Sequence, residues 1–370
     1  PSRRPAGARL RHAGGKSTPD LLRRRSTDVQ EAPDAIVYPA SHEEVSTLLS
    51  LCDERAIAVV PFGGGTSVVG GLDPERGGFT AVIAVDLRRM SGLVSLDEES
   101  GTAVLLPGTT GPEAEELLGA KGFSLGHFPQ SFRFASIGGF AATRSSGQAS
   151  SGYGRFDAMV DAVRIATPRG DLELGRAPAS AAGPDLRQLF LGSEGALGII
   201  TEVTVRVHRL PEETWYQGWS FPSFDAGAQA LRTLVQSDAA PTVLRLSDEA
   251  ESGLNLALAK DIGGKNPAAG VLAITTVEGT PGHVAARSAE VAAVLSAAGG
   301  TALGDEPGKA WDHGRFDAPY LRDALIDAGA VVETLETATS WRSLATLRMA
   351  VTTALSETLG AQGTPPLVLC

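Results

Sequence analysis

Apolar and polar positions divide the chain from about residue 33 into short helices and strands. In SHEEVSTLLSLC (41–52) apolar residues recur at helical spacing, and Ser41 with Glu44 forms a capping box at its start. A β-branched strand over 56–60 follows, and further strands are predicted at 80–86, 93–96 and 102–106. Thr110 and Glu113 begin another capped helix. This order predicts a mixed α+β domain.

The pattern continues to about residue 213 and then changes. Residues 159–166 and 172–174 flank the turn PRGD and predict a hairpin, and the glycine-rich GSEGALG (192–198) leads into a strand of alternating valines. The four tryptophans all lie beyond Pro211, and Trp311 and Trp341 are expected in a core there. Helices near 225–237 and 285–298, with strands near 243–246 and 270–276, predict a second α+β domain. We therefore expect an N-terminal arm (1–33), one domain over 34–213 and another over 214–370.

Composition narrows the class of protein. Hydrophobic residues make up 42% of the 370 positions, and no apolar stretch approaches the roughly 20 residues that cross a bilayer, so we expect a soluble, cytoplasmic protein. Cys52 and Cys370 are too few for a disulfide framework or a thiolate metal site, and no metal is expected. A net charge of −11 argues against a nucleic-acid partner. The basic first 25 residues are interpreted as a solvated arm, with a membrane surface or another partner as the alternative.

Three glycine-rich loops suggest a bound phosphate. GGGTSVVGG (63–71) is not a dinucleotide fingerprint, because Val68 stands where a glycine is required, and it lacks the lysine of a P-loop. Consecutive main-chain N–H groups in such a turn can still form a nest that binds a phosphate or diphosphate. Similar loops at 136–147 and 192–198 suit one long ligand, although three unrelated turns remain an alternative. The small residues of 132–154 predict a ligand-bound loop, with a disordered loop as the alternative.

Several of these motifs resemble a known family. PDAIVYPASHEEV, PFGGGTSV, SIGG and GSEGALGIIT resemble, in order, the FAD-binding domain of the vanillyl-alcohol oxidase/p-cresol methylhydroxylase (PCMH) superfamily. Within it, GKSTPDLLRRRS, GHFPQSFRFASIGGFAATRSSG and RAPASAAGPDLRQLFLGSEGALGIITEVTVRV resemble the alkyldihydroxyacetonephosphate synthases. The resemblance implies FAD, a PCMH-type domain of two subdomains over 34–213 and an α+β cap over 214–370. The FAD is expected to be non-covalent, because no histidine precedes the loops in an obvious attachment motif, and a homodimer is expected.

The resemblance also implies which residues form the cofactor site. Residues 61–67 would cradle the FAD diphosphate, 130–136 would run along the flavin, and 143–146 with 194–200 would complete the shell. These residues are Pro61, Phe62, Gly63, Gly64, Gly65, Thr66, Ser67, Gln130, Ser131, Phe132, Arg133, Phe134, Ala135, Ser136, Thr143, Arg144, Ser145, Ser146, Glu194, Gly195, Ala196, Leu197, Gly198, Ile199 and Ile200. Gln130 and Arg133 stand where the synthases carry acids, and Phe140 replaces a tryptophan, so the resemblance is weaker for the substrate than for FAD.

The implied reaction exchanges the acyl group of acyl-dihydroxyacetone phosphate for a fatty alcohol through an adduct at flavin N5, a step of ether lipid synthesis. In this transferase Arg322 (YLRD) would bind the substrate phosphate, Arg245 (VLRL) would be a second required arginine, and His127 (LGHFP) would transfer a proton near the flavin. Ordinary salt bridges and a structural histidine are the alternatives. The histidines at 12, 42, 208, 283 and 313 are expected in loops or on polar faces.

Two other functions stay open. An FAD-linked D-2-hydroxyacid (lactate or glycolate) dehydrogenase or oxidase would use the same architecture for redox chemistry, and a binding module would keep FAD only as structure. Family members continue with a catalytic tyrosine and a histidine cluster that do not occur by Cys370. We therefore expect a piece of a longer protein rather than an inactive one.

Overall fold

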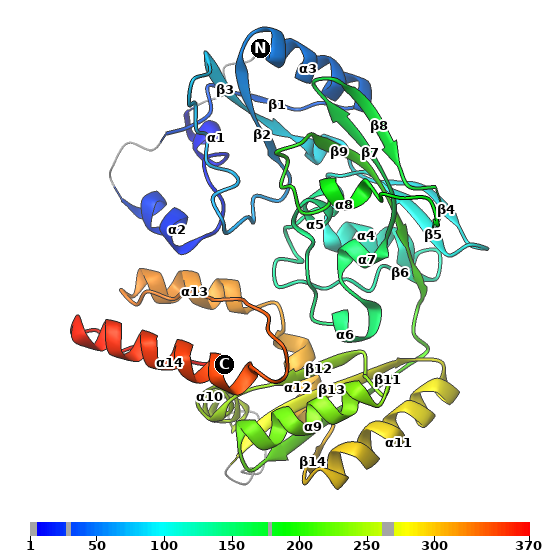
Figure 1. The fold of residues 1–370 in the computed structure, drawn as a ribbon, viewed down its shortest axis with the longest axis vertical. Helices are drawn as coiled ribbons and strands as arrows, with labels where there is room; N and C mark the ends of the chain where they lie inside the picture. Colours follow the sequence, from blue (N-terminus) through cyan, green and yellow to red (C-terminus); the bar gives the residue numbers. More distant parts are fainter. Residues whose placement is uncertain (1–5, 27–30, 177–179, 261–269) are drawn as a thin grey trace. The chain divides into compact units, whose positions relative to one another are not determined.

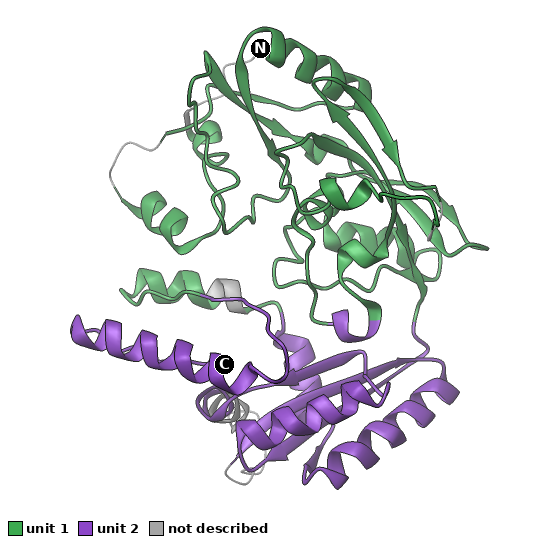
Figure 2. Cartoon of the chain, in the orientation of Figure 1, with its two compact units in different colours: residues 1–148, 153–210, 316–333 green, residues 149–152, 211–315, 334–370 purple. Residues whose placement is uncertain are grey.

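The computed structural model describes residues 6–26, 31–176, 180–260 and 270–370, and the chain divides into two compact units (Figure 2). The first unit comprises residues 1–148, 153–210 and 316–333, and the second comprises 149–152, 211–315 and 334–370. The main division falls at 210/211, near the predicted 213. The arm belongs to the first unit, and so does a segment after residue 315 that was assigned to the second domain.

A parallel sheet begins the first unit (Figure 1). Its strands are β1 (Ala35–Val37), β2 (Ile57–Phe62) and β3 (Ala81–Asp86), in the order β1-β3-β2. Helix α3 (His42–Glu54) connects β1 to β2 and buries Val45, Leu49 and Cys52 against this sheet. The Ser41 hydroxyl caps its first turn as predicted, but the Glu44 carboxylate accepts from the N–H of Ala40 rather than completing a box with Ser41.

An antiparallel sheet forms the rest of the first unit. Its order is β4-β5-β9-β7-β8, with bounds β4 (Leu93–Asp97), β5 (Thr102–Leu105), β7 (Val160–Thr167), β8 (Gly170–Leu174) and β9 (Ile199–Arg206). The strands β6 (Phe123–Ser124) and β10 (His208–Arg209) form a separate, short antiparallel pair. Between β3 and β9 this unit also contains the helices η1 (Leu87–Arg89), α4 (Gly111–Gly119), α5 (Ile137–Thr143), α7 (Phe156–Met159) and α8 (Arg187–Phe190). Thr110 and Glu113 form the predicted capping box of α4.

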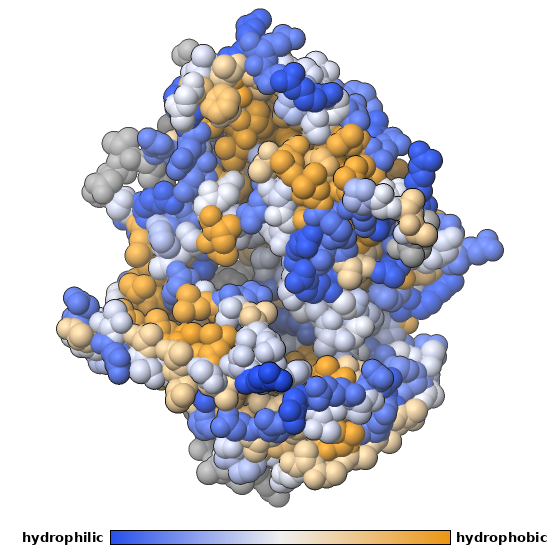
Figure 3. All heavy atoms as spheres, viewed as in Figure 1, coloured by the Kyte–Doolittle hydropathy of each residue, from blue (hydrophilic) through white to orange (hydrophobic). Residues whose placement is uncertain are grey.

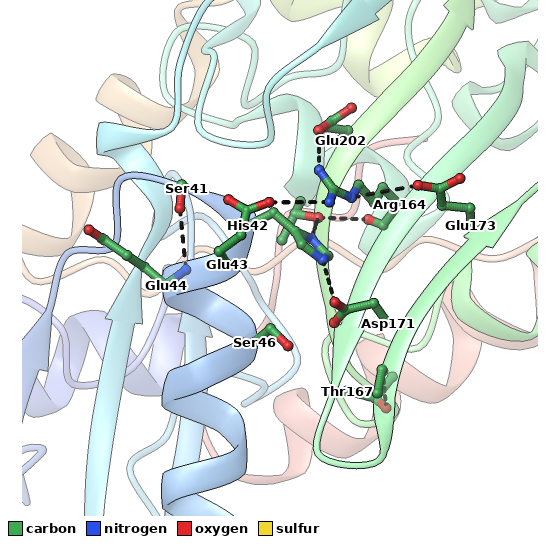
Figure 4. A network of polar contacts seen from close by, with 12 residues as sticks. Ser41, His42, Glu43, Glu44, Ser46, Arg164, Thr167, Asp171, Glu173 and Glu202 are labelled. Atoms are coloured by element: carbon green, nitrogen blue, oxygen red, sulfur yellow. Dashed lines mark hydrogen bonds and ion pairs between the residues drawn. The ribbon is translucent and has the colours of Figure 1, made fainter.

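A polar network joins α3 to the antiparallel sheet (Figure 4). His42, at the start of α3, is buried, with its Nδ1 2.7 Å from Thr201 Oγ1 on β9 and its Nε2 3.0 Å from Asp171 Oδ2 on β8. The contact with His42 lowers the pKa of Asp171. Beside it, Arg164 of β7 pairs with Glu202 and Glu43. The expectation that His42 lies on an exposed face is wrong, because this residue fixes the two subdomains together.

The N-terminal arm is folded onto the first unit. It contains α1 (Ala6–Leu10) and α2 (Thr18–Arg25), and buries Ala8, His12, Asp20 and Leu21. The expectation of a solvated arm is therefore wrong. The many arginines suggested a segment exposed to solvent, but Arg23 forms ion pairs with Asp20 and Asp73 within the fold.

The second unit is an antiparallel sheet with helices. The sheet order is β12-β13-β11-β14, with bounds β11 (Glu213–Phe221), β12 (Val243–Leu246), β13 (Val271–Gly279) and β14 (Thr301–Gly304). The helices are α9 (Phe224–Gln236), α10 (Glu249–Lys260), α11 (Pro281–Ala297), α12 (Glu306–Gly314) and α14 (Leu344–Ala361), while α6 (Ser150–Tyr153) straddles the division. Helices α9 and α11 pack on the sheet around Trp219 and Phe221.

The tryptophan prediction for this unit needs correction. Trp219 is the buried one, 1% exposed and bonded through its indole N–H to Thr275, whereas Trp341 is 40% exposed and Trp311 is half-buried. Along α14 no described side chain is buried, and Met349 is 65% exposed. Figure 3 shows apolar surface over this helix.

Candidate cofactor site

The three glycine-rich segments come together in the first unit. A Cβ added to Gly64 would lie 2.6 Å from the carbonyl carbon of Phe134, and one added to Gly195 would lie 2.6 Å from the ring of Pro61. The N–H groups of Gly192 and Glu194 donate to the carbonyls of Ala141 and Ala142, at the end of α5. Because only glycine permits such close approaches, the predicted loops at 63–67 and 192–198 both lie against residues 134–142, which include the start of the predicted loop 136–147. The alternative of three unrelated turns is wrong.

The first loop, residues 61–67, leaves most of its main-chain N–H groups free. The N–H groups of residues 64–68 donate no hydrogen bond to any described part of the chain. Ser67 adds a buried hydroxyl that has no partner among the described residues. Buried or half-buried donors without acceptors are costly unless something binds them. A diphosphate supplies the required acceptors, so this loop fits the nest that the sequence predicts.

The loop at 192–198 closes the far side of the nest. A Cβ on Gly71 would lie 2.8 Å from Glu194 Oε2, so the carboxyl group lies over the end of the first loop. Glu194 is exposed overall, and partial desolvation of its carboxyl group raises its pKa. Ala196 and Leu197 are exposed, whereas Ile199 and Ile200 begin β9 with buried side chains. The two isoleucines can therefore contribute to a ligand only through their main chain.

Residues 130–136 form a bent segment with alternating exposure. Gln130, Arg133 and Phe134 are exposed, with Phe134 at 52%, while Phe132 and Ala135 are buried. Ser136 caps α5 by accepting from the N–H of Gly139. The alternative of a disordered loop over 132–154 is wrong in its centre, because Ile137, Phe140 and Ala141 of α5 pack into the core.

The residues after α5 act mainly within the fold. Thr143 donates its hydroxyl to the carbonyl of Gly139, and Arg144 donates to the carbonyls of Leu191 and Gln188. Arg144 thus holds the third loop in place through that loop's flank. Ser146 is exposed, and Ser145 Oγ lies 3.0 Å from His127 Nε2.

His127 is enclosed by aromatic rings. Its side chain is fully buried against Phe140 and Phe156, and its Nδ1 has no partner among the described residues. Burial lowers the pKa of His127 to about 4, so the ring is neutral at physiological pH. This placement favours a structural role; proton transfer by His127 stays a prediction.

The two predicted arginines differ in their surroundings. Arg245 on β12 forms an ion pair with Glu251, as the salt-bridge alternative supposes. Arg322 lies on α13 (Ala318–Asp327) in the first unit, where its buried Nε has no partner among the described residues. An unpaired, half-buried guanidinium is suited to bind an anionic ligand.

Two contacts join the segment that carries Arg322 to residues 130–136, which are predicted to run along the flavin. The ring of Phe316 stacks on Phe132 with centroids 5.0 Å apart, and Arg133 pairs with Asp317 at 3.2 Å. The arginine that departs from the family's acid therefore holds the base of α13. The sequence motif YLRD gave no indication of this contact.

Among the described residues, no three His, Cys, Asp or Glu side chains gather as metal ligands. None of the helices described is both long and apolar enough to cross a bilayer.

Comparisons with known proteins define the class. The family model for the FAD binding domain matches residues 33–174, and the model for the C-terminal domain of FAD linked oxidases matches 210–364. A solved p-cresol methylhydroxylase, 17% identical, matches 85% of this chain with a TM-score of 0.64. The chain is thus a flavoprotein with an FAD-binding domain and an FAD-oxidase-type second domain, and the α+β PCMH-type fold prediction is confirmed.

More similar proteins define the family. The chain is 35% identical over 99% of its length to an alkyldihydroxyacetonephosphate synthase of Trypanosoma brucei brucei, and 38% identical over 92% to one of Dictyostelium discoideum. A solved alkyldihydroxyacetonephosphate synthase is 36% identical over 98% of this chain, with a TM-score of 0.87, and the chain covers 68% of it. The chain belongs to the alkyldihydroxyacetonephosphate synthase family. It spans 62% and 58% of the lengths of the two curated relatives.

Proposed function

We propose that this chain is the FAD-binding and cap part of an enzyme that exchanges the acyl group of acyl-dihydroxyacetone phosphate for a fatty alcohol. The observation that carries the proposal is the unpaired guanidinium of Arg322, at the position where the family places its phosphate-binding arginine. Membership of the synthase family supports it, and D-lactate dehydrogenase and glycolate oxidase relatives match only about 60% of the chain.

Each part of the site has a definite task in this function. The free N–H groups at 64–68 would hold the FAD diphosphate, and the segment 130–136 would line the ring system. FAD, when bound, would supply the reactive centre of the exchange. Arg322 would bind the substrate phosphate through two parallel N–H donors and so orient the acyl-bearing carbon.

The arginine is tested by binding rather than by turnover. The FAD-loaded protein is titrated with palmitoyl-dihydroxyacetone phosphate and with the parent dihydroxyacetone phosphate, and the flavin absorption spectrum reports binding. Arg322→Lys keeps the charge but loses the bidentate geometry, so we expect a dissociation constant about tenfold higher, near the 1.4 kcal/mol of one charged hydrogen bond. Arg169→Lys, in the exposed turn of the hairpin, is the matched control. Equal affinity in both variants would remove Arg322 from the site.

The redox alternative is separated in the same cuvette. Under anaerobic conditions D-lactate would bleach the flavin of a dehydrogenase, whereas the proposed exchange leaves no lasting reduction after the phosphorylated ester is added. Bleaching by D-lactate, with no response to the ester, would replace this proposal by the dehydrogenase.

We also propose a homodimer with a cytoplasmic location, which the composition and the two cysteines support, and a peripheral contact of the basic first 25 residues with a membrane surface. Light scattering on the FAD-loaded protein tests the dimer, and sedimentation with anionic vesicles tests the contact.

A further inference from the structure

Residues that come before the FAD-binding family match lie directly on the first glycine-rich loop, named here the cofactor loop (residues 61–73). The model match begins at residue 33, yet residues 12–20, named here the N-terminal strap, pack against residues 67–73. The N–H of Lys16 donates to the carbonyl of Ser67 at 2.7 Å, and that of Gly14 donates to the carbonyl of Leu72 at 3.0 Å. The strap therefore donates hydrogen bonds to the carbonyl groups of Ser67 and Leu72, while the N–H groups of residues 64–68 remain free.

The fit between strap and loop is close. A Cβ on Gly15 would lie 2.8 Å from the carbonyl carbon of Ser67 and closer still to its oxygen. Asp20 holds the turn of the strap, because its carboxylate accepts from the N–H groups of Gly15 and Ser17, both at 3.1 Å. Burial opposes ionisation of Asp20, but the hydrogen bonds from Ser17 and Arg23 outweigh it and lower its pKa.

A buried histidine anchors the strap at the root of the loop. His12 Nε2 lies 2.9 Å from Asp86 Oδ2, and its Nδ1 lies 2.9 Å from the carbonyl oxygen of Ala8. Its ring packs on Phe62, 4.4 Å between centroids, and Phe62 immediately precedes the glycines. Asp86, which pairs in register with Phe62, is fully buried and also binds Arg88. The expectation that His12 lies in an exposed loop is therefore wrong.

We propose that the N-terminal strap is a component of the FAD site: it fixes the shape in which the loop presents its free amides, and it thereby slows FAD release. A glycine-rich turn with five unbonded N–H groups has little of its own to hold one conformation. External contacts at Ser67, Leu72 and Phe62 supply that constraint. Preorganising a binding loop raises affinity without any new contact to the ligand.

The test compares two glycines of the N-terminal arm. Gly15→Ala drives a methyl group into the carbonyl of Ser67, whereas Gly7→Ala adds the same methyl group where nothing lies within 4 Å. FAD is removed from each protein and titrated back, and the affinity is read from flavin fluorescence. We expect the dissociation constant to rise about tenfold for Gly15→Ala and to stay within about twofold for Gly7→Ala. Unchanged affinity in Gly15→Ala would overturn the inference.

A second readout separates cofactor retention from general damage. The melting temperature of each protein is measured without FAD and with a fixed FAD concentration. If the strap acts on the cofactor, the rise in melting temperature on adding FAD is smaller for Gly15→Ala than for the parent protein. If the melting temperatures with and without FAD fall by the same amount, the strap is only structural and the inference fails. These measurements use FAD alone, so they do not depend on the proposed exchange reaction.

A variant at the other end of the strap covers the case in which Gly15→Ala is not recovered folded. His12→Ala removes the anchor on Asp86 without any steric clash, and His283→Ala, exposed on α11, is its control. We expect faster FAD release from His12→Ala in a stopped-flow chase and no change from His283→Ala. Identical release rates would count against the strap as firmly as the glycine result.

Discussion

Gly64 offers the sharpest perturbation of the cofactor loop. A methyl group there would lie 2.6 Å from the carbonyl carbon of Phe134 and 2.7 Å from Cα of Ala135, where ordinary contact begins at 3.4 Å. Both neighbours are main chain and cannot rotate away. Gly64→Ala must therefore push the diphosphate loop away from the segment 130–136.

The size of the effect follows from this overlap. Overpacking a fitted site costs about 1–3 kcal/mol, and here the cost falls on the geometry of the FAD site. If it appears fully in binding, FAD affinity falls between about fivefold and 150-fold. Gly78→Ala, in the same β2–β3 connection with nothing within 4 Å, should leave it unchanged.

Equilibrium dialysis against FAD, with protein-bound flavin read at 450 nm, measures the loss. Far-ultraviolet circular dichroism of the FAD-free proteins checks that the two variants are folded alike. A folded Gly64→Ala protein that retains the parent's affinity would refute the convergence of the loops on a shared ligand.

Three further predictions concern pH and reactivity. Burial opposes ionisation of Asp86, but hydrogen bonds with His12 and Arg88 outweigh it and lower the pKa of Asp86 from 3.8 to about 2. The ionised carboxylate therefore contributes about 2 kcal/mol to the free energy of unfolding, which is present above pH 4 and lost as pH falls toward 2. Asp86→Asn should flatten the acidic part of a plot of melting temperature against pH. Burial lowers the pKa of His127 from 6.5 to about 4, so the unfolded chain is protonated at a higher pH than the folded one. The free energy of unfolding therefore falls by about 3 kcal/mol between pH 6.5 and 4. His127→Phe should remove that loss, and an unchanged dependence of melting temperature on pH would contradict the buried neutral ring. Cys52 is buried with a raised pKa, so in a Cys370→Ser protein a thiol reagent should label it only at the rate of unfolding, and immediate labelling would show that α3 opens in the native state.

Local periodicity predicted the regular elements well. The strand at 243–246 and the helices near 225–237 and 285–298 occur within a few residues of their predicted bounds, because each carries its own alternation or helical spacing. The glycine loops could also be predicted, since an unusual backbone requires an unusual residue at the position itself.

Contacts between distant segments could not be predicted in this way. Nothing in the spacing of His12 or Gly15 indicates that Asp86 and Ser67 receive them, and the arginines around them suggested solvent instead. The small residues of α5 gave no amphipathic pattern, although Ile137, Phe140 and Ala141 are buried. Trp219 and Trp341 are the same residue type, but the register of β11 buries Trp219, whereas Trp341 lies outside that sheet and is 40% exposed.

The order in which the walls of the cofactor site leave the ribosome has a consequence for flavin loading. The strap is made first, its docking loop some fifty residues later, and the closing loop at 192–198 only after the hairpin β7–β8. A nascent chain that ends before residue 198 therefore has an incomplete nest, even when the strap and residues 67–73 have already been made. We expect flavin capture to be a late event, which commits the whole first unit at once.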